Sequence, residues 1–593
     1  MSSRARAVAV FVSLFGACVL SGSAQQPEPE TKRAPTKTKP SGNPLSTYQP
    51  VTVERLKNPE EGNWLAIRRT YDGWGFSPLK EITTGNVAQL KPVWNVKTGV
   101  DTVHEAAPLV NNGVMFVSTP NNQVFALNAR TGAMLWRHQR PRPKGAFVLH
   151  QTNRGVALYG DKVYYAAGEA LLVALDAKTG KEVWARSVAD NKSAYYITLA
   201  PLVADRKIMI GASGGEFGVR GFIAAFDPES GKELWRTFTV PAPGEPGSET
   251  WPKGDQWKTG GAPVWVTGNY DPETNIAYWG TGNGGPWMGD QRPGDNLYVA
   301  STVAVDVATG QIKGHFQYNP NESWDWDEVS PPLLIDYSRN GRTIKGLVNV
   351  ARDGYVWFLE RSSGPITFVE GKPFVTQNVF KSLDPVTGKP EVNPDHKPGT
   401  DKRAEFCPGS HGGKNWPPIA FSPLTRMIYI PANNNLCGAL VGIPVQYKAG
   451  TSFAGVRFGG PPLTAPGAKH IGGEVQAWNV DTGMRVWTHE YPSSPNWGSM
   501  LATAGGLVFT GGTNDRKLHA FDAATGKLLW EAETNSGIVA PPSTFMVDGR
   551  QYVAVETGWA GDVAGMNGGL NRLFPGKYPD PPKGGAIWVF ALP

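Results

Sequence analysis

The fold is decided by the segment VALDAKTGKEVW (173–184) and by the segments that resemble it along the chain. These are FALNARTGAMLW (125–136), AAFDPESGKELW (224–235), QAWNVDTGMRVW (476–487), HAFDAATGKLLW (519–530) and the degenerate VAVDVATGQIKG (303–314). Each reads as a strand of alternating apolar residues, a turn of the type Asp/Asn-x-x-Thr/Ser-Gly, and a second strand that ends in Trp in all but the degenerate copy. Glycine allows the positive φ that such a turn needs, and Asp or Asn caps the turn with its side chain. The chain therefore repeats one type of β-hairpin.

The spacing of the repeats indicates the architecture. Trp136 and Trp184 are 48 residues apart, Trp184 and Trp235 are 51 apart, and Trp487 and Trp530 are 43 apart. These spacings fit one propeller blade of four short strands with its loops. Helical periodicity of any length is almost absent, and a run of hairpins without helices favours a sandwich, a barrel or a propeller. The recurrence of one turn at blade spacing selects the propeller.

The number of blades follows from the length of the folded part. At roughly 45 residues per blade, the chain after residue 48 would fill about twelve blades, more than propellers usually contain. We therefore assign the surplus to long loops at 240–265, 284–300 and 365–415. The sequence predicts an all-β fold, an eight-bladed β-propeller with tryptophan-docking repeats over residues 49–593. Because AIWVFALP (586–593) resembles QVFALNA (123–129), we expect the two ends of the chain to pair and close the ring.

Composition and charge exclude several classes of protein. The 593 residues include 71 Gly and 50 Pro, with 40% hydrophobic and 18% charged residues, which excludes a disordered chain, a collagen and a coiled coil. The net charge is +6, most of it within the first 48 residues, and no block of Lys and Arg indicates a nucleic-acid partner.

The N-terminal segment predicts export. Arg4 and Arg6 precede an apolar run at residues 7–20 and small residues at 21–24, which together indicate a signal peptide over residues 1–24. A membrane anchor is the alternative, but the run is short for a bilayer. A lipid-modified Cys18 is another, although Phe15 lies where Leu is usual. Residues 25–48 read as a flexible Pro- and Lys-rich linker. No later apolar run reaches 18 residues, so we expect no transmembrane anchor in the mature protein.

Two familiar motifs are tested by their context. Cys407 and Cys437 are an even pair in an exported protein, which favours one disulfide, with two buried thiols as the alternative. No C-x-x-C-H is present, so no c-type haem is expected. GTGNGG (280–285) matches a dinucleotide motif formally, but the PWMGDQRPGDN that follows cannot open the helix which such a site requires.

Acidic and amide side chains stand at three positions that favour function. Glu216 lies in the Gly-rich turn GASGGEFGVRG (211–221), Asn283 ends WGTGN, and Asp325 and Asp327 alternate with tryptophans in NESWDWDEV. Acids flanked by Trp lose solvation and need a cation or a hydrogen-bond donor as partner. The structural alternatives are that Glu216 pairs with Arg220 and that Asp327 caps a turn.

These motifs, taken together with others, resemble a known family. The others are YDGWGFSPLKEI (71–82), HEAAPLV (104–110), NRGVA (153–157), KNWPP (414–418) and NWGSMLATAGGLVF (496–509). In this order and spacing, over about residues 60–593, the sequence resembles the pyrroloquinoline quinone (PQQ)-dependent alcohol dehydrogenases of the methanol/ethanol type.

The resemblance implies a role for each matching residue. Glu216, Asn283 and Asp325 would hold a metal ion against PQQ, and Asp325 would also be the catalytic base. Trp265 would lie flat under the PQQ ring, and Arg352 would bond the reactive quinone oxygens. The implied contacts with the cofactor come from Glu105, Arg154, Thr198, Ser213, Gly214, Gly215, Arg352, Asn415 and Trp497. The pair Cys407 and Cys437 matches a structural disulfide of the family.

Asp327 leaves the identity of the metal open. An Asp two residues after the base is an additional ligand in lanthanide-using members, since a larger and more charged ion accepts another carboxylate. The same spacing also resembles calcium-using glucose dehydrogenases. We therefore expect Ca²⁺ or a lanthanide ion.

The sequence departs from the alcohol dehydrogenases at one place. Where these usually carry two adjacent cysteines, this chain has Val148 and Leu149. His150 follows, as in PQQ-dependent glucose dehydrogenases, which predicts that it packs on the cofactor; a buried structural histidine is the alternative. Glucose dehydrogenases, however, usually have Lys in place of Arg352 and five membrane helices that this chain lacks.

The sequence thus predicts a periplasmic quinoprotein dehydrogenase that oxidises a primary alcohol to an aldehyde by hydride transfer to metal-bound PQQ. A small alcohol is the expected substrate, and an external acceptor, cytochrome c or a quinone, is expected to take the electrons. A PQQ-dependent sugar dehydrogenase and a non-enzymatic envelope scaffold are the alternatives. The oligomeric state stays open, with a homodimer among the choices.

Overall fold

The computed structural model describes residues 42–460 and 463–593. The predicted signal peptide and the linker up to residue 41 lie outside the described residues. The end of the predicted linker, however, is structured: η1 (Pro44–Thr47) forms, and Leu45 and Tyr48 are buried in the core. The packed region therefore begins near residue 43 rather than at residue 49, because these two apolar side chains bury surface among otherwise polar neighbours.

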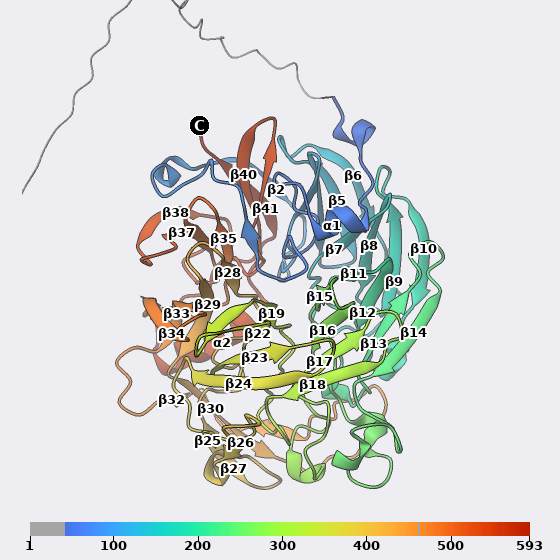
Figure 1. The fold of residues 1–593 in the computed structure, drawn as a ribbon, viewed down its shortest axis with the longest axis vertical. Coiled ribbons are helices and arrows are strands. Elements are labelled where there is room, and N and C mark those ends of the chain that lie inside the picture. Colours follow the sequence, from blue (N-terminus) through green and yellow to red (C-terminus); the bar gives the residue numbers. More distant parts are fainter. Residues whose placement is uncertain (1–41, 461–462) are drawn as a thin grey trace, which may run out of the picture. The chain divides into compact units, whose positions relative to one another are not determined.

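The described strands form a series of antiparallel four-stranded sheets in which strands follow in chain order (Figure 1). Four sheets come from the first part of the chain. They contain β3 (Leu109–Asn111), β4 (Val114–Thr119), β5 (Gln123–Asn128) and β6 (Met134–Gln139); β7 (Val156–Tyr159), β8 (Lys162–Ala167), β9 (Leu171–Asp176) and β10 (Glu182–Ser187); β11 (Leu202–Ala204), β12 (Lys207–Gly211), β13 (Phe222–Phe226) and β14 (Glu233–Phe238); β15 (Asn269–Asp271), β16 (Ile276–Gly280), β17 (Ser301–Asp306) and β18 (Ile312–Gln317).

The second part of the chain forms the remaining sheets of this kind. They contain β19 (Leu333–Leu334), β22 (Gly346–Val350), β23 (Tyr355–Arg361) and β24 (Ile366–Pro373); β28 (Ala420–Ser422), β29 (Met427–Asn434), β33 (Gly472–Asn479) and β34 (Met484–Tyr491); β35 (Leu501–Thr503), β36 (Leu507–Thr510), β37 (Lys517–Asp522) and β38 (Leu528–Glu533), which β1 (Phe76–Ser77) joins in parallel; and β39 (Ser543–Val547), β40 (Arg550–Thr557) and β41 (Ala586–Ala591) with β2 (Lys91–Lys97). Among residues 42–460 and 463–593, eight sheets follow one another in this way, which is consistent with eight propeller blades; a further four-stranded sheet lies within residues 403–464.

The two ends of the chain close the ring as predicted. The C-terminal strand β41 pairs antiparallel with β2 on one side and with β40 on the other. In Figure 1 the sheets follow one another around the molecule, and β41 and β2 lie together near the label of the C-terminus.

The repeated Trp and Gly connect successive blades. Nε1 of Trp136 donates to the carbonyl of Ala177 in the next repeat at 3.0 Å, and the indole covers Gly180, where a Cβ would lie 2.5 Å from the ring. Similar pairs join Trp94 to Gly132, Trp184 to Gly231, Trp235 to Gly310 and Trp487 to Gly526. The turn glycine is therefore required for two reasons: its positive φ, and the tryptophan packed against it.

Segments outside the blade strands contain additional small elements, some of them in the predicted long loops at 240–265, 284–300 and 365–415, although the blade strand β24 occupies the start of the third loop. These are β20 (Tyr337–Arg339), β21 (Arg342–Ile344), β25 (Phe380–Leu383), β26 (Pro390–Val392), β27 (Arg403–Phe406), β30 (Leu436–Gly442), β31 (Val456–Phe458) and β32 (Leu463–Thr464), with the short helices α1 (Val53–Lys57), η2 (Val87–Gln89), η3 (Asn191–Ser193), η4 (Gly215–Phe217), η5 (Ser248–Thr250), η6 (Gln256–Thr259), η7 (Gly289–Gln291) and η8 (Pro394–His396). One longer helix, α2 (Gly561–Leu573), lies between β40 and β41 and was not expected from the sequence. In the described part of the chain, no helix has the length and apolar character needed to cross a membrane.

Antiparallel pairing gathers two kinds of loop at one end of the blades. The innermost strand of a blade runs away from that end, the second strand returns, and the third leaves again. The loop before the first strand and the loop between the second and third strands therefore lie at the same end. Residues far apart in the sequence can meet there, and the candidate site uses both kinds of loop.

Candidate active site

A cavity of about 340 Å³ contains most of the residues that the sequence singled out. Of these, it is lined by His150, Arg154, Thr198, Ser213, Gly214, Gly215, Glu216, Trp265, Asp325, Asp327, Arg352 and Asn415. Ser213 to Glu216 and Arg352 lie in loops between the second and third strands of their blades, whereas Arg154, Trp265 and Asn415 precede first strands. Residues from these two kinds of loop meet because both kinds lie at the same end of the blades.

Three predicted residues lie next to the cavity without lining it. Glu105 pairs with Nη2 of Arg154 at 2.9 Å. The backbone N–H of Asn283 donates to Oδ1 of Asp327 at 2.6 Å. Trp497 is buried, and its ring lies 5.8 Å from that of His411, a lining residue.

The cavity brings acidic side chains together with few positive charges to balance them. Burial raises the pKa of Asp325 well above its usual range, Asp327 and Glu216 raise it further, and Arg352 opposes the shift. Burial also raises the pKa of Glu216 and of Asp327. Because each of the three carboxylates disfavours ionisation of a neighbour, a cation among them would lower their free energy.

The donor set fits a hard cation. Oε2 of Glu216 is buried and has no protein hydrogen-bond partner. A Cβ at Gly215 would collide with Oδ1 of Asn283, so the glycine leaves room for that amide oxygen. All these donors are oxygens, the ligands that Ca²⁺ and similar ions prefer. Within residues 42–460 and 463–593, no three His, Cys, Asp or Glu side chains form a ready metal cluster, so an ion would have to draw the ligands together.

The two structural roles considered for the acids, an ion pair of Glu216 with Arg220 and a turn cap by Asp327, are both absent from the described part of the chain. Arg220 pairs with Glu245 at 3.3 Å and not with Glu216. Asp327 does not cap a turn of its own; its oxygens contact the N–H of Asn283 and Nη2 of Arg352, the latter at 3.3 Å. Asp325 itself has a φ of 65°, a left-handed conformation that is uncommon for a residue with a side chain and that recurs at functional sites.

Arg154 and the tryptophans form a surface suited to a flat anion. The guanidinium carbon of Arg154 lies 4.8 Å from the ring centre of Trp265 and 4.5 Å from that of Trp416. Nη1 of Arg154 also donates to the hydroxyl of Thr198. An aromatic face beside a cation and a hydroxyl suits a planar group that carries carboxylates.

Arg352 connects the carboxylates to the opposite wall. Its Nη1 donates to the carbonyl of Asp325 at 2.9 Å, and its Nη2 lies 3.4 Å from Oδ1 of Asn415. Its Nε is buried without a protein partner. The guanidinium is therefore held from several sides and keeps a donor for a ligand.

His150 lies at the cavity rather than in the core. Its Nδ1 is 3.9 Å from Oδ1 of Asp562, and its ring centre is 6.3 Å from that of Tyr196. The side chain is 37% exposed, so a buried structural histidine is not what is seen. Leu149, where the resembling family has cysteine, also lines the cavity.

Several lining residues were not predicted from the sequence. They are Tyr196, Pro263, Trp287, His411, Phe458 and Asp562. His411 lies four residues before Asn415 and Tyr196 lies two residues before Thr198, so both could have been predicted from their position beside these residues. Phe458 and Asp562 follow no motif, since β31 and α2 interrupt the repeat.

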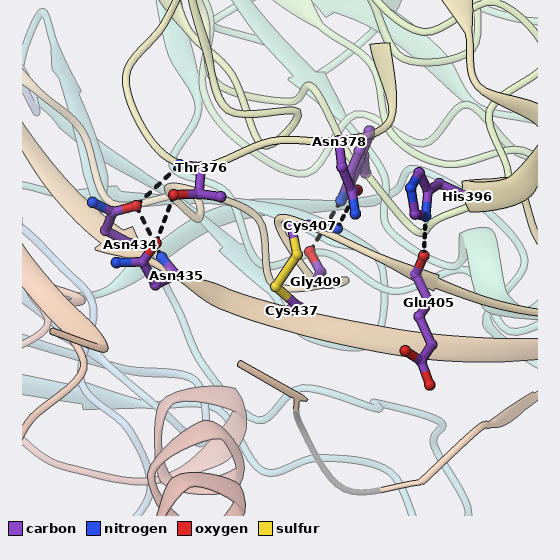
Figure 2. Close-up of a disulfide and its surroundings, with 10 residues drawn as sticks. Thr376, Asn378, His396, Glu405, Cys407, Gly409, Asn434, Asn435 and Cys437 are labelled. Atoms are coloured by element: carbon purple, nitrogen blue, oxygen red, sulfur yellow. Dashed lines mark hydrogen bonds between the residues drawn. A yellow bond between two sulfur atoms is a disulfide. The ribbon is translucent and has the colours of Figure 1, made fainter. Parts of the chain in front are cut away.

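Cys407 and Cys437 form the predicted disulfide, so the alternative of two thiols is wrong (Figure 2). The backbone N–H of Cys407 donates to Oδ1 of Asn378 at 2.8 Å, and that of Gly409 donates to the carbonyl of Leu436 at 2.9 Å. The disulfide and the bond from Gly409 tie the loop at 408–415, which carries His411 and Asn415, to strand β30.

Comparisons with known proteins agree with this geometry. A family model described as "PQQ: Glucose/ethanol/alcohol dehydrogenase, beta-propeller domain" matches residues 64–383 and 489–553. Quinoprotein alcohol dehydrogenase PedH of Pseudomonas putida is 38% identical over 566 residues, which cover 91% of this chain and 92% of the relative.

Solved structures extend the agreement to the fold. A europium-containing methanol dehydrogenase aligns with a TM-score of 0.84 at 32% identity, over 91% of this chain and 100% of that one. The quinohemoprotein alcohol dehydrogenase of Comamonas testosteroni aligns with a TM-score of 0.81 at 33% identity, over 93% of this chain and 84% of that one. The chain therefore belongs to the glucose/ethanol/alcohol dehydrogenase family of PQQ β-propeller proteins.

Proposed function

We propose that this protein is a periplasmic PQQ-dependent dehydrogenase that oxidises a primary alcohol to an aldehyde. The observation that carries the proposal is one cavity shared by Glu216, Asp325 and Asp327 with Trp265 and Arg352. Acidic oxygen ligands, an aromatic surface and an arginine are the groups that a cation and an anionic quinone together require. The family is one of enzymes, which leaves the scaffold alternative without support.

The residues divide the work as follows. Glu216, Asn283 and Asp325 would hold the cation, and Asp327 would add a further oxygen. Arg154 and the hydroxyl of Thr198 would hold the carboxylates of the cofactor, while Glu105 positions the guanidinium of Arg154. When bound, PQQ would supply a carbonyl, polarised by the cation, as the hydride acceptor. Asp325 would take the hydroxyl proton as general base.

The electrons must then leave the protein. The sequence contains no C-x-x-C-H motif for a c-type haem, so we propose an external acceptor, a cytochrome c or a quinone. The N-terminal export signal and the Cys407–Cys437 disulfide both support a periplasmic location.

The base assignment is tested by Asp325→Asn. We expect PQQ to bind as in the wild type, by absorbance, and kcat with an artificial acceptor to fall by at least about a hundredfold, because a general base typically contributes that much. Asp161→Asn, at a carboxylate that is 59% exposed, is the matched control and should keep full activity. An active, PQQ-loaded Asp325→Asn enzyme would refute the assignment.

The metal assignment is tested by Asp327→Ala. We expect activity with La³⁺ to fall much more than activity with Ca²⁺, since the trivalent ion gains more from an additional carboxylate. Steady-state rates at saturating concentrations of each ion measure this difference. Equal losses with both ions would show that Asp327 acts through Arg352 instead, with which it pairs at 3.3 Å.

A sugar dehydrogenase is the second candidate, favoured by the polar pair of His150 and Asp562 at the cavity. These groups can hydrogen-bond the additional hydroxyls of a sugar, which a simple alkyl alcohol does not have. Turnover of ethanol, methanol and glucose, each with Ca²⁺ and with La³⁺, discriminates the two candidates. Glucose as the best substrate would replace the primary-alcohol proposal.

A further inference from the structure

A second, smaller cavity lies behind the pair of Arg154 and Glu105. Its volume is about 60 Å³, and Arg68, Asn349 and Lys414 are among the polar side chains that line it. Apart from Arg154, it shares no lining residue with the candidate active site. None of Arg68, Asn349 and Lys414 has a role in the proposed reaction.

Arg68 is buried without a carboxylate partner. It is 6% exposed, and its Nη2 donates to the carbonyls of Ile419 at 2.7 Å and Met500 at 2.9 Å. Its Nε and Nη1 have no protein hydrogen-bond partner. Among the described residues, no Asp or Glu oxygen lies within 4 Å of this guanidinium, since it takes part in none of the ion pairs of residues 42–460 and 463–593.

Lys414 repeats the pattern on the other side of the cavity. It is 2% exposed, and its Nζ donates to Oγ of Ser330 at 3.1 Å and to the carbonyl of Asn415 at 2.6 Å. It too forms no ion pair in the described part of the chain. Glu328, the carboxylate that faces it, already accepts from Asn319 and from the backbone N–H groups of Arg352 and Asp353.

The unused polar groups of Arg68 and Asn349 are donors, whereas the acidic side chain in the lining, Glu105, pairs with Arg154 at 2.9 Å. Besides the two nitrogens of Arg68, Nδ2 of Asn349 is buried without a protein partner. A buried unpaired cation and a buried unused donor both carry a desolvation penalty, and two cations in one cavity also repel each other. One acceptor that carries negative charge between them relieves all these penalties.

The size of the cavity limits what this acceptor is. The cavity volume of about 60 Å³ exceeds the roughly 10–15 Å³ that one water molecule requires, so a small ion fits. We propose that the cavity between Arg68 and Lys414 is a binding site for a small monovalent anion of halide size, chloride being the natural occupant. The site binds the anion through the guanidinium of Arg68 and the ammonium of Lys414.

The electrostatics of Lys414 support the site. Burial lowers the pKa of Lys414 to about 7, Glu328 opposes that shift, and Arg352 and Arg68 add to it. An anion stabilises the charged form of the lysine. Because Nζ of Lys414 donates to the carbonyl of Asn415, which lines the active-site cavity, an occupied site also steadies that wall.

Anomalous diffraction from crystals of the PQQ- and Ca²⁺-loaded protein soaked in bromide tests the proposal directly. We expect a bromide peak in the cavity, within hydrogen-bond distance of Nζ of Lys414 and of Nε or Nη1 of Arg68. Density without an anomalous peak would mean that water alone occupies the cavity and would overturn the proposal.

Thermal unfolding in chloride and in methanesulfonate at equal ionic strength tests the same site in solution. We expect chloride to raise the midpoint of the wild type by about 1 °C for each tenfold increase above its Kd. Lys414→Met should lose this dependence. Lys162→Met is the control and should keep it, because Lys162 is also a mostly buried lysine, 9% exposed, but pairs with Asp161 and Glu229, each at 2.8 Å.

Two further outcomes are decisive. If Lys414→Met does not fold, Arg68→Met replaces it, with the same expected loss of chloride dependence. A bromide peak without any chloride effect on the wild-type midpoint would show binding at crystal concentration only and would overturn the proposal. A chloride effect that survives both Lys414→Met and Arg68→Met would place the anion elsewhere and would also overturn it.

Discussion

At the scale of single residues, the site is built from buried charges that the protein leaves partly uncompensated. Glu216 keeps an unpartnered oxygen and Arg352 an unpartnered Nε, both facing the same cavity. Such groups are costly in a folded protein, since a buried unused donor or acceptor loses its water without a replacement. The proposed cation and cofactor would supply the missing partners.

His104, next to the predicted cofactor contact Glu105, gives a pH prediction at this scale. Burial lowers its pKa to about 4, and the neutral ring donates from Nδ1 to the carbonyl of Thr102 at 2.7 Å while Nε2 accepts from Thr98. The unfolded histidine, with a pKa near 6.5, binds a proton first, so stability is lost as the pH falls from about 6.5 toward 4. Between about pH 7 and about pH 4.5 this group accounts for about 2–3 kcal/mol.

Urea unfolding of the wild type and of His104→Gln at both pH values measures the contribution. We expect the wild type to lose more stability on acidification than the variant does, by that amount. An identical loss in both proteins would show that His104 is not the titrating group.

At the scale of elements, each repeated hairpin turn forms one unit with the tryptophan of the preceding blade that packs on its glycine. Asp522 accepts from the backbone N–H groups of Ala524 and Thr525 and shapes the turn, and Gly526 then passes under the indole of Trp487. The side chain of one blade thus fixes the turn of the next. This contact explains why the same residues recur at each blade.

Gly526→Ala separates the two requirements on the glycine. A Cβ there would lie 2.5 Å from the ring of Trp487. Gly549→Ala is the matched control, because Gly549 has a similar positive φ, 75° against 73°, and open space around it. We expect the control to lose about 1 kcal/mol of unfolding free energy from backbone strain alone. Gly526→Ala should lose about 2 kcal/mol more from the clash, as measured by denaturant unfolding. Equal losses would contradict the packing role.

At the scale of the whole molecule, ring closure holds the site together. The cavity draws together residues as far apart in sequence as Arg154 and Asp562, and the blade that carries Asp562 is completed by β2 and β41 from opposite ends of the chain. In β41, Ile587, Val589 and Phe590 are fully buried. Three such side chains contribute roughly 6 kcal/mol, comparable with the net stability of a typical protein.

Removal of residues 586–593 is therefore expected to prevent folding. The truncated chain should show no cooperative thermal transition by tryptophan fluorescence and should not bind PQQ. Removal of Pro593 alone leaves β41 intact and should preserve both. A truncated protein with a normal transition would show that the ring does not depend on β41.

The repeats, the turn glycines and the closing strand were predictable from the sequence because strand alternation and turn chemistry are local. The disulfide was also predicted, and the acids at 216, 325 and 327 were identified as a group through their motifs. The start of the packed region was placed too late, because the burial of Leu45 and Tyr48 depends on a surface that the linker sequence does not describe.

The sequence by itself determined that the chain is a closed set of similar β-blades, and its motifs predicted acidic and aromatic residues that line one cavity, since these features are written as patterns within short segments. Only the tertiary structure decided that His150 faces Asp562, that Arg154 lies between Trp265 and Trp416, and that Arg68 and Lys414 share a buried cavity. These partners come from different blades, and their meeting depends on how the blades close around a common axis, which no local pattern encodes.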